Sequence, residues 1–315
     1  VDKKNSFENK SLLTFKLGDH TLGLSEEMSQ TKVICSKMDC GMQAGEFFPY
    51  NFGPEMPADQ NADDKKSLYF DSEKLENDTS IQGRPKLSLL LSTDKPLGQL
   101  AARLCDLRPD GSSALISHGF LNLTMRQSFE EPKLLKVGKK YKVTIELDDI
   151  AYLIPAGHKI RLSLSNCYWP FMWPSPEITT MNVFSGSLII PQRLLDSDLG
   201  SVTFEKPVFG SPWDVEVIRK ASSLRKEFMN FDTNEFVVEV KNDSGHTRDL
   251  SHGLETDSSV VERWFISGQD PLSARVEIDW KQELARDEWK IFTSAQLKVT
   301  CCKDRFYLTA SISAS

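Results

Sequence analysis

Most periodic segments of this chain alternate apolar and polar residues with a period of two, which is the spacing of a strand and not of a helix. From Tyr141 to Leu147, every second residue is apolar and the residues between them are polar. The same alternation occurs at 160–165, 276–280, 289–299 and 306–312, and 87–91 is a short apolar run typical of a buried strand. The best helix candidate, 215–225, lacks a clean apolar stripe. The pattern predicts an all-β chain.

Turn residues divide these predicted strands into short elements. Asp232-Thr233-Asn234 separates the apolar segments 228–231 and 236–240, which predicts a hairpin. Residues 196–200 are polar and rich in turn formers, and they follow an apolar run that ends at Ile190, so we expect a domain boundary near there. Many short strands between turns indicate a sandwich or a barrel.

Charge and composition exclude several classes of protein. The net charge is −7 and acidic and basic residues are interspersed, which argues against a nucleic-acid or anionic-membrane surface. No apolar run is long enough to span a bilayer, so we expect no membrane partner. Six cysteines in 315 residues are too few for a disulfide scaffold, which favours reduced thiols and a cytoplasmic chain. The first residue is Val1, which suggests a fragment or a processed product.

Metal and cofactor signals are weak. Cys35 and Cys40 could form a loop disulfide or half of a metal site, but no second Cys/His pair follows at ligand spacing. The carboxylates of Asp59, Asp63 and Asp64 could hold Ca²⁺, but hydrogen bonds to neighbouring turns are the favoured interpretation. We expect no metal and no cofactor. At the adjacent pair 301–302, one cysteine is expected to be buried.

No reactive constellation is present in the sequence. The chain contains no Gly-x-Ser-x-Gly elbow, no His-Glu-x-x-His helix and no phosphate-binding glycine loop. Its five histidines are scattered through predicted turns and strands. We therefore predict no catalytic residue on this chain.

Two Pro-containing segments concentrate large aromatic rings. Residues 47–52 read Phe-Phe-Pro-Tyr-Asn-Phe, and residues 168–174 read Tyr-Trp-Pro-Phe-Met-Trp-Pro. Such rings could bind a sugar or an apolar ligand, or they could dock another domain. They could also plug the end of a sandwich, and for Trp169 and Trp173 the sequence leaves plugging and docking open.

An ordered series of short motifs resembles one enzyme family. The motifs are 57–60 (Pro-Ala-Asp-Gln), 67–70 (Ser-Leu-Tyr-Phe), 83–85 (Gly-Arg-Pro), 102–106, 108–111 (Arg-Pro-Asp-Gly), 119–123, Arg126, 155–161 and 165–176. The series is similar to the C-terminal region of X-Pro dipeptidyl-peptidases and cocaine-esterase-like (CocE/NonD) hydrolases. Residues 270–280 resemble an extra C-terminal β region of a bacterial branch of that family.

The resemblance implies a domain organisation. Residues 57–192 would form a jelly-roll, galactose-binding-like β-sandwich, preceded by lead-in strands and an interface loop at 1–56. Residues 193–315 would form a second, smaller β domain. Arginines beside turn carboxylates, such as Arg126 or Arg161, would tie loops together through bidentate hydrogen bonds.

The resemblance also implies that catalysis and the shaping of the substrate pocket belong to different domains. In that family, catalysis belongs to an N-terminal α/β-hydrolase domain whose Ser-His-Asp triad has no counterpart here. The jelly roll would pack on that domain, stabilise it and close one side of its substrate pocket. Phe47, Phe48 and Tyr50 would then be pocket-wall residues. The domain-interface aromatics would be Tyr168, Trp169 and Trp173.

Other functions stay open at this stage. A homo-oligomer is one further partner that the sequence allows. A stand-alone carbohydrate- or ligand-binding module is the main alternative function, and it would show a groove with aromatic platforms. An enzyme acting through this chain alone would need a Ser or Cys beside one of the histidines.

Overall fold

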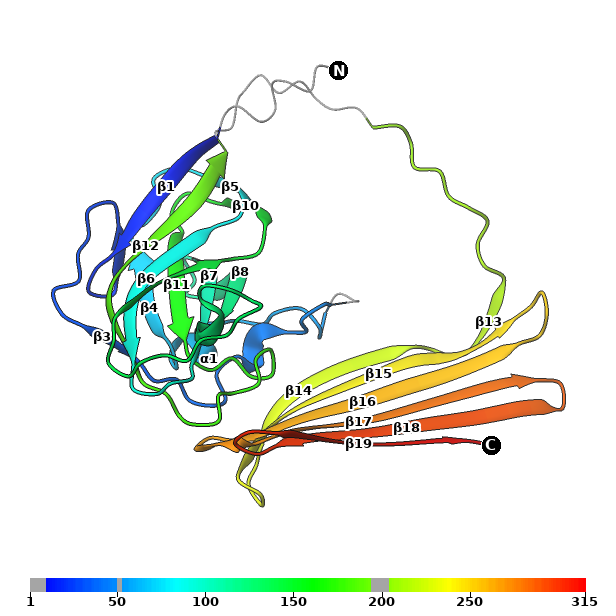
Figure 1. Ribbon diagram of the computed structural model, residues 1–315. Helices are drawn as coiled ribbons and strands as arrows, with labels where there is room; N and C mark the ends of the chain where they lie inside the picture. Colours follow the sequence, from blue (N-terminus) through cyan, green and yellow to red (C-terminus); the bar gives the residue numbers. More distant parts are fainter. Residues whose placement is uncertain (1–9, 50–52, 194–203) are drawn as a thin grey trace. The chain divides into compact units, whose positions relative to one another are not determined.

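The computed structural model describes residues 10–49, 53–193 and 204–315, and the chain divides into two compact units (Figure 1). The first unit contains strands β1 to β12 and the second contains strands β13 to β19. Helical structure in the described residues is limited to α1 (Asn61–Asp64) and the 3₁₀ turns η1 (Met42–Ala44) and η2 (Leu123–Met125). None of these is long and apolar enough to cross a membrane. The prediction of an all-β chain is confirmed.

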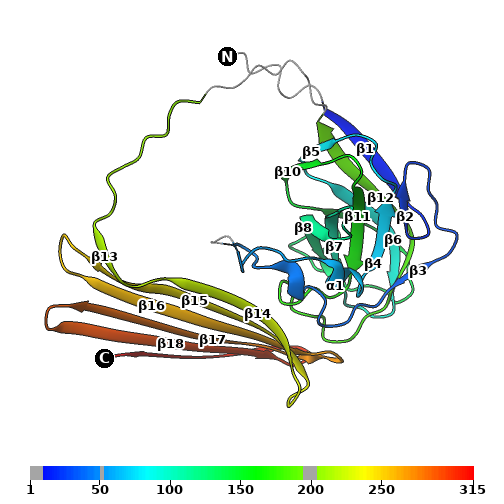
Figure 2. The same ribbon diagram turned by 180° about the vertical axis from the view of Figure 1, so that it is seen from behind.

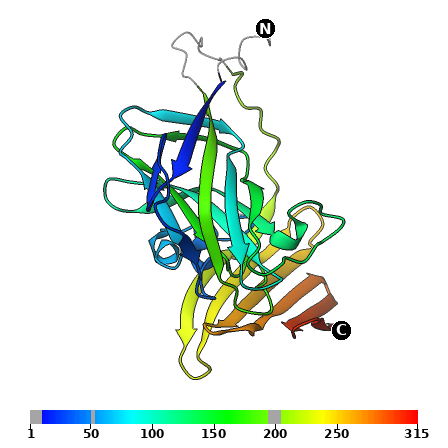
Figure 3. The ribbon, with the colours of Figure 1, turned by 60° about the vertical axis from the view of Figure 1, so that its left-hand side comes forward.

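The first unit is built around the long strand β12, which pairs with β1, β3, β5 and β6 (Figure 3). The main path of the sheet runs β10-β5-β12-β1-β2-β4-β11-β7-β8, and β9 pairs with β6. The strands are β1 (Lys10–Leu17), β2 (Thr21–Gly23), β3 (Lys32–Ile34), β4 (Leu68–Ser72), β5 (Thr79–Gly83), β6 (Lys86–Thr93), β7 (Gln99–Leu107), β8 (Ser113–Asn122), β9 (Tyr141–Glu146), β10 (Ile150–Ile154), β11 (Lys159–Ser165) and β12 (Met181–Arg193).

Alternating side chains from these strands form one core, as the period of two requires. In β9, Val143 and Ile145 are buried while Lys142, Thr144 and Glu146 are exposed. The early strand β1 belongs to the same sheet, because it pairs with β12 along its length. The boundaries expected at residues 56 and 192, and the jelly-roll topology, stay predictions.

Strand β11 departs from its predicted half-exposed pattern. Its apolar residues Ile160, Leu162 and Leu164 are buried, but Ser163 and Ser165 on the opposite face are buried as well. Their face contacts a charged cluster inside the unit, described below, instead of water. The expectation of a solvated face is therefore wrong here, and the burial of Ser163 is tolerated because its hydroxyl donates a hydrogen bond to Asp64.

The second unit is a seven-stranded antiparallel sheet, whose strands lie side by side (Figure 2). The order is β13-β15-β16-β17-β18-β19, with β14 pairing with β15. The strands are β13 (Val215–Arg219), β14 (Ser222–Asn230), β15 (Glu235–Asp249), β16 (Glu255–Ser267), β17 (Asp270–Arg286), β18 (Trp289–Cys301) and β19 (Phe306–Ala314).

The predicted hairpin is confirmed in this sheet. Asn230 pairs with Glu235 across the turn, and Asn234 takes a positive φ of 55°. An asparagine tolerates this left-handed conformation better than most residues. The expected burial of one cysteine at 301–302 is wrong, because both Cys301 and Cys302 are partly exposed near the outer strand β19.

Asn234 provides a test of this hairpin. We expect Asn234→Gly to leave the free energy of unfolding nearly unchanged, and Asn234→Val to lower it by about 1–2 kcal/mol, the cost of a left-handed backbone. Equilibrium urea unfolding measures both. The matched control is Asp232→Val in the same turn, where φ is not positive. Equal losses from the two valine variants would contradict the backbone explanation.

Candidate functional site

Two loops meet at one end of the first unit. The loop after β3 and the loop after β11 are joined by a hydrogen bond from the Trp169 backbone N–H to the Cys40 carbonyl at 2.7 Å, and the Cys167 thiol donates to the Met38 carbonyl at 3.2 Å. Gly41, with φ of 106°, lies at the crossing, and a Cβ there would come within 2.8 Å of the Trp169 backbone. Only glycine permits both this conformation and this approach.

Aromatic rings from both loops and from β8 form a surface cluster above this crossing. The ring of Phe171 lies 5.8 Å from Phe47, 5.6 Å from His118 and 6.0 Å from Phe120. Beneath it, the buried Tyr168 ring lies 5.6 Å from Phe171. We call Phe47, His118, Phe120 and Phe171 the aromatic patch. Its centroid distances and tilted or edge-on geometry are those of favourable aromatic pairs.

The loop that supplies Phe47 has further exposed apolar residues. Phe47 and Phe48 are 74% and 77% exposed, and Met56 is 41% exposed. The two sides of this loop are joined by a hydrogen bond from the Glu46 N–H to the Glu55 carbonyl at 2.8 Å. Tyr50 lies outside the described residues. Exposed Phe47 and Phe48 are available to a ligand or a domain, and their role as pocket wall stays a prediction.

The rings of the second loop lie deeper than those of the first. Tyr168 and Trp169 are fully buried, and Trp173 packs edge-on against Trp169 with ring centroids 5.3 Å apart. Whether Tyr168, Trp169 and Trp173 plug the end of the unit or contact another domain stays a prediction. Phe171, His118 and Phe120 were not singled out from the sequence, although Phe171 lies inside the segment that was.

His118 combines a carboxylate partner with partial burial. Its Nδ1 lies 3.0 Å from the Asp148 carboxylate, and its ring stands edge-on to Phe120 at 4.9 Å. Burial lowers the pKa of His118 below its ordinary value, and the attraction of Asp148 opposes that shift without cancelling it. His118 is therefore a largely neutral ring at neutral pH, compatible with an apolar contact.

A buried charge cluster lies directly under the aromatic patch. Arg103 of β7 is fully buried and its guanidinium lies 3.0 Å from Asp64, 3.1 Å from Gln60 and 2.9 Å from Ser67. The same guanidinium lies over the Tyr168 ring at 5.6 Å, a cation–π contact. We call Arg103, Asp64, Gln60 and their direct partners the buried charge cluster.

Asp64 joins β7, β8 and β11 through its two oxygens, and its partner on β7 is Arg103. It accepts hydrogen bonds from Ser113 of β8 and Ser163 of β11, both at 2.8 Å, and from Arg161 at 3.2 Å. Arg161 in turn makes two bonds to Asp71 at 2.7 and 2.8 Å, and these bonds raise its pKa above the ordinary value. The bidentate bonds predicted for Arg161 are present, but Asp71 lies on the neighbouring strand β4 and not in a turn, so these bonds join two strands and not two loops.

The predicted role of Arg126 is wrong in its choice of partner. Its guanidinium donates to the carbonyls of Leu123 and Lys133 at 2.9 and 2.6 Å and stacks on the Tyr141 ring at 4.4 Å. Arg126 therefore closes a loop through carbonyls and an aromatic face and not through a carboxylate.

The three aspartates considered for Ca²⁺ have protein partners. Asp59 accepts from the N–H groups of Asn61 and Ser113, Asp63 accepts from the Gln43 N–H at 3.0 Å, and Asp64 is held as described above. Within the described ranges, no group of His, Cys, Asp and Glu side chains is arranged to hold a metal ion. The favoured interpretation of these aspartates, hydrogen bonds to neighbouring turns, is confirmed for Asp59 and Asp63.

All six cysteines are free thiols in the structure. Burial raises the pKa of Cys40 to about 11 and that of Cys105 to about 12. Such thiols stay protonated at neutral pH and behave as small apolar groups.

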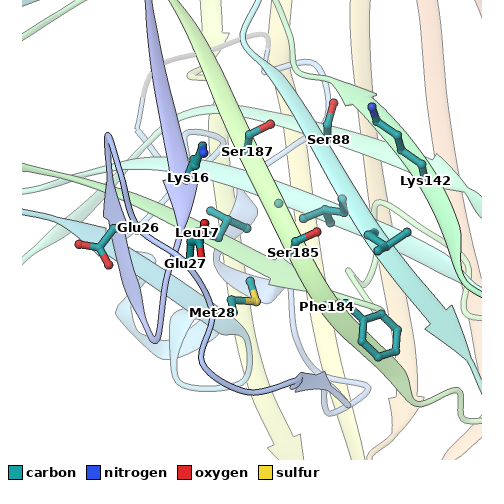
Figure 4. A pocket seen from close by; sticks show the side chains of 13 residues that line it. Lys16, Leu17, Glu26, Glu27, Met28, Ser88, Lys142, Phe184, Ser185 and Ser187 are labelled. Carbon is teal, nitrogen blue, oxygen red and sulfur yellow. The ribbon is translucent and has the colours of Figure 1, made fainter.

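A groove on another face of the first unit tests the ligand-binding alternative. It has a volume of about 550 Å³ and is lined by residues that include Lys16, Glu26, Lys142, Phe184, Ser185 and Ser187 (Figure 4). Phe184 is its single aromatic ring, and the Lys140 ammonium lies 3.8 Å from the ring centroid. A sugar stacking on that ring would have to compete with this cation–π contact, so the groove lacks a free aromatic platform.

The histidines pair with carboxylates or backbone atoms. His158 lies 2.7 Å from Asp106, His246 lies 2.8 Å from Glu255, and His20 bonds the Tyr69 carbonyl. Across the part of the chain that the structure describes, no histidine hydrogen-bonds a Ser or Cys side chain.

Comparison with known proteins gives one family match. The model of the X-Pro dipeptidyl-peptidase C-terminal non-catalytic domain matches residues 5–197. The cocaine esterase of Rhodococcus sp. (strain MB1 Bresler) is 25% identical over 123 residues, which cover 38% of this chain and 21% of that protein. The Xaa-Pro dipeptidyl-peptidase of Lactobacillus delbrueckii subsp. lactis is 27% identical over 132 residues, 31% of this chain and 17% of that protein.

The chain thus spans about a fifth of the length of these curated relatives. Among solved structures, an aminopeptidase from the marine sediment archaeon Thaumarchaeota archaeon has 17% identity and a TM-score of 0.49, covering 59% of this chain and 37% of that one. An alpha-amino acid ester hydrolase has 18% identity and a TM-score of 0.49, with coverages of 57% and 36%.

The Arg103–Asp64 pair predicts a large loss of stability when one partner is removed. We expect Arg103→Met to lower the free energy of unfolding by about 3–5 kcal/mol, because it leaves a buried carboxylate short of a partner. The control is Arg84→Met, which breaks ion pairs of a half-exposed arginine with Glu146 and Asp149 and should cost about 0–1 kcal/mol. Urea unfolding followed by circular dichroism measures both, and similar small losses would contradict the assignment.

The environment of His118 predicts its titration. We expect its pKa, measured by NMR, to lie below the ordinary value of about 6.5, because burial disfavours the charged ring. Phe171→Ala should raise this pKa by admitting water, and Asp148→Asn should lower it further by removing the favourable charge. If neither substitution changes the pKa of His118, then Phe171 and Asp148 do not control its titration.

Proposed function

Because the chain belongs to the family of X-Pro dipeptidyl-peptidase C-terminal non-catalytic domains, we propose that it braces a serine-hydrolase domain and completes that domain's substrate pocket. The partner would be an α/β-hydrolase domain in the same polypeptide. Its Ser-His-Asp triad would hydrolyse an ester or amide through an acyl-enzyme. This chain would supply apolar surface and rigidity, and no reacting group.

One observation carries this proposal: large apolar side chains are held exposed by a firmly anchored loop. Phe47, Phe48 and Met56 remain open to water while the ends of the loop are held by hydrogen bonds, at the Cys40 carbonyl and at Gln60. Burying one such side chain contributes about 1.5–3 kcal/mol, so a domain covering this surface would gain substantially. Exposed clusters of this kind mark interaction sites.

The anchoring supports a role as pocket wall as well as docking surface. The Gln60 side chain donates to the carbonyls of Gln43 and Ala58, both at 2.7 Å, and accepts from Arg103. We call the loop that carries Phe47 and Phe48 the aromatic loop. Its two ends, at Gln43 and Ala58, are therefore both hydrogen-bonded to Gln60 of the buried charge cluster. A wall that shapes a substrate needs this rigidity, because displacements of about 1 Å already cost reactivity.

The proposed setting is the cytoplasm. Free thiols throughout the chain, including the exposed Cys35, suit a reducing compartment.

The full-length enzyme tests the pocket role. We expect Phe47→Ala and Phe48→Ala, separately and with Tyr50→Ala, to raise KM and to shift the preference among acyl or side-chain groups. The physical reason is the loss of apolar wall area. Steady-state kinetics over a substrate series of increasing side-chain size measure both effects.

Phe129→Ala is the matched control, because Phe129 is a similarly exposed phenylalanine of the same unit. We expect it to leave KM and preference unchanged. If the loop variants also leave both unchanged, the pocket role is wrong. If they weaken association of a separately produced hydrolase domain without changing preference, the surface is for docking alone.

A further inference from the structure

The outer strand β19 of the second unit has one side without a neighbour. Within the described residues it pairs with β18 alone, in a regular register from Cys301–Phe306 to Thr293–Ala314. All nine residues from Phe306 to Ala314 are exposed. The segment contains no charged residue and no proline, the usual protections of an edge strand.

The opposite edge of the same sheet is protected. It is formed by β13 and β14, and the pairing of β13 with β15 is interrupted by an irregularity between Val217 and Arg219. Charged side chains lie along it, including Arg219, Lys226 and Glu227. Bulges and charges prevent the pairing of edges, so the sheet has one blocked edge and one open edge.

The hydrogen bonds at the end of β19 show which backbone groups are free. Ser315 and Phe292 exchange both backbone hydrogen bonds, at 2.9 and 3.0 Å. In an antiparallel pair this exchange occurs at every second residue. The backbone N–H and C=O groups of Tyr307, Thr309, Ser311 and Ser313 therefore point toward β18. The N–H and C=O groups of residues 308, 310, 312 and 314 therefore point to the open side.

The alternation of apolar and polar residues in β19 is symmetric about Ala310. In an antiparallel pairing centred there, Ala310 lies opposite itself, Leu308 opposite Ile312 and Phe306 opposite Ala314. The intervening positions place Thr309 opposite Ser311 and Tyr307 opposite Ser313. Apolar residues thus meet apolar ones on one face and uncharged polar residues meet on the other, and the free backbone groups fall at the positions that exchange hydrogen bonds.

We propose that β19 is the interface with a second copy of this chain, paired antiparallel about a two-fold axis at Ala310. A neutral edge suits this partner, because two copies that each carry a net charge of −7 repel except where the contact is uncharged. The assembly closes at two copies, because the other edge of each sheet is blocked. This inference is independent of the hydrolase role.

The test is the mass of the 315-residue chain in solution. By light scattering after gel filtration, over a micromolar to near-millimolar range, we expect twice the 35.6 kDa of one chain. Ala310→Pro removes an N–H on the open side and no bond to β18, so it should give a folded monomer. Ala310→Lys places two ammonium groups opposite each other and should also give a monomer.

Ile218→Lys on β13 is the matched control, because it adds a charge at an exposed position of the blocked edge, and it should stay a dimer. Circular dichroism checks that each variant is folded. A wild-type monomer, or a dimer that survives both Ala310 substitutions, overturns the proposal.

Hydrogen exchange distinguishes a second copy from another cover of the same edge. We expect the amides of Leu308, Ala310 and Ile312 to exchange more slowly as concentration rises, and those of Thr309 and Ser311 to be protected at all concentrations. Protection of all five amides in a monomer would mean that the chain covers its own edge, and it would overturn the proposal.

Discussion

The first unit depends on a full-length arginine buried among its strands. Arg103 lies in a strand whose neighbouring side chains are apolar, so its charge must be compensated inside the protein. Asp64 supplies the opposite charge at 3.0 Å, Gln60 and Ser67 accept further hydrogen bonds, and Tyr168 offers its ring face. Because the buried Arg103 needs this carboxylate and these acceptors together, the strands and loops that provide these groups are restricted to one arrangement.

The contacts of Arg103 also restrict the positions of the surface loops. Gln60 connects Arg103 to the backbone at Gln43, and Gln43 lies between two glycines at the start of the aromatic loop, Gly41 and Gly45. On the other side, Tyr168 connects Arg103 to Phe171 and thus to the aromatic patch. Polar contacts in the interior therefore position the loops that carry the exposed apolar rings. A surface held in this way can contact a partner without first being ordered, which lowers the entropic cost of association.

The sequence predicted the strands well because alternation is a local property. Val143 and Ile145 face the core as their spacing requires, and the hairpin at Asn234 follows from its turn residues. Burial on both faces of β11 could not be predicted, since it depends on Arg103 and Asp64, which lie far away in the sequence. The one local signal in the sequence was Arg103, a charged residue between the apolar residues of β7. Likewise, the aromatic loop was found from composition, whereas the meeting of Phe47 with Phe171 and His118 depends on how the two loops cross.

The two units expose different features that could bind a partner. In the first, the buried charge cluster holds exposed apolar side chains, so its interactions would be selected by shape and apolar contact. In the second, the open side of β19 leaves backbone groups as the exposed feature, and these accept any strand of suitable register. Selectivity at such an edge must come from side-chain matching. The neutral strand β19, whose apolar and polar residues alternate symmetrically about Ala310, provides that matching for a copy of itself, while the charged and irregular strand β13 provides it for none.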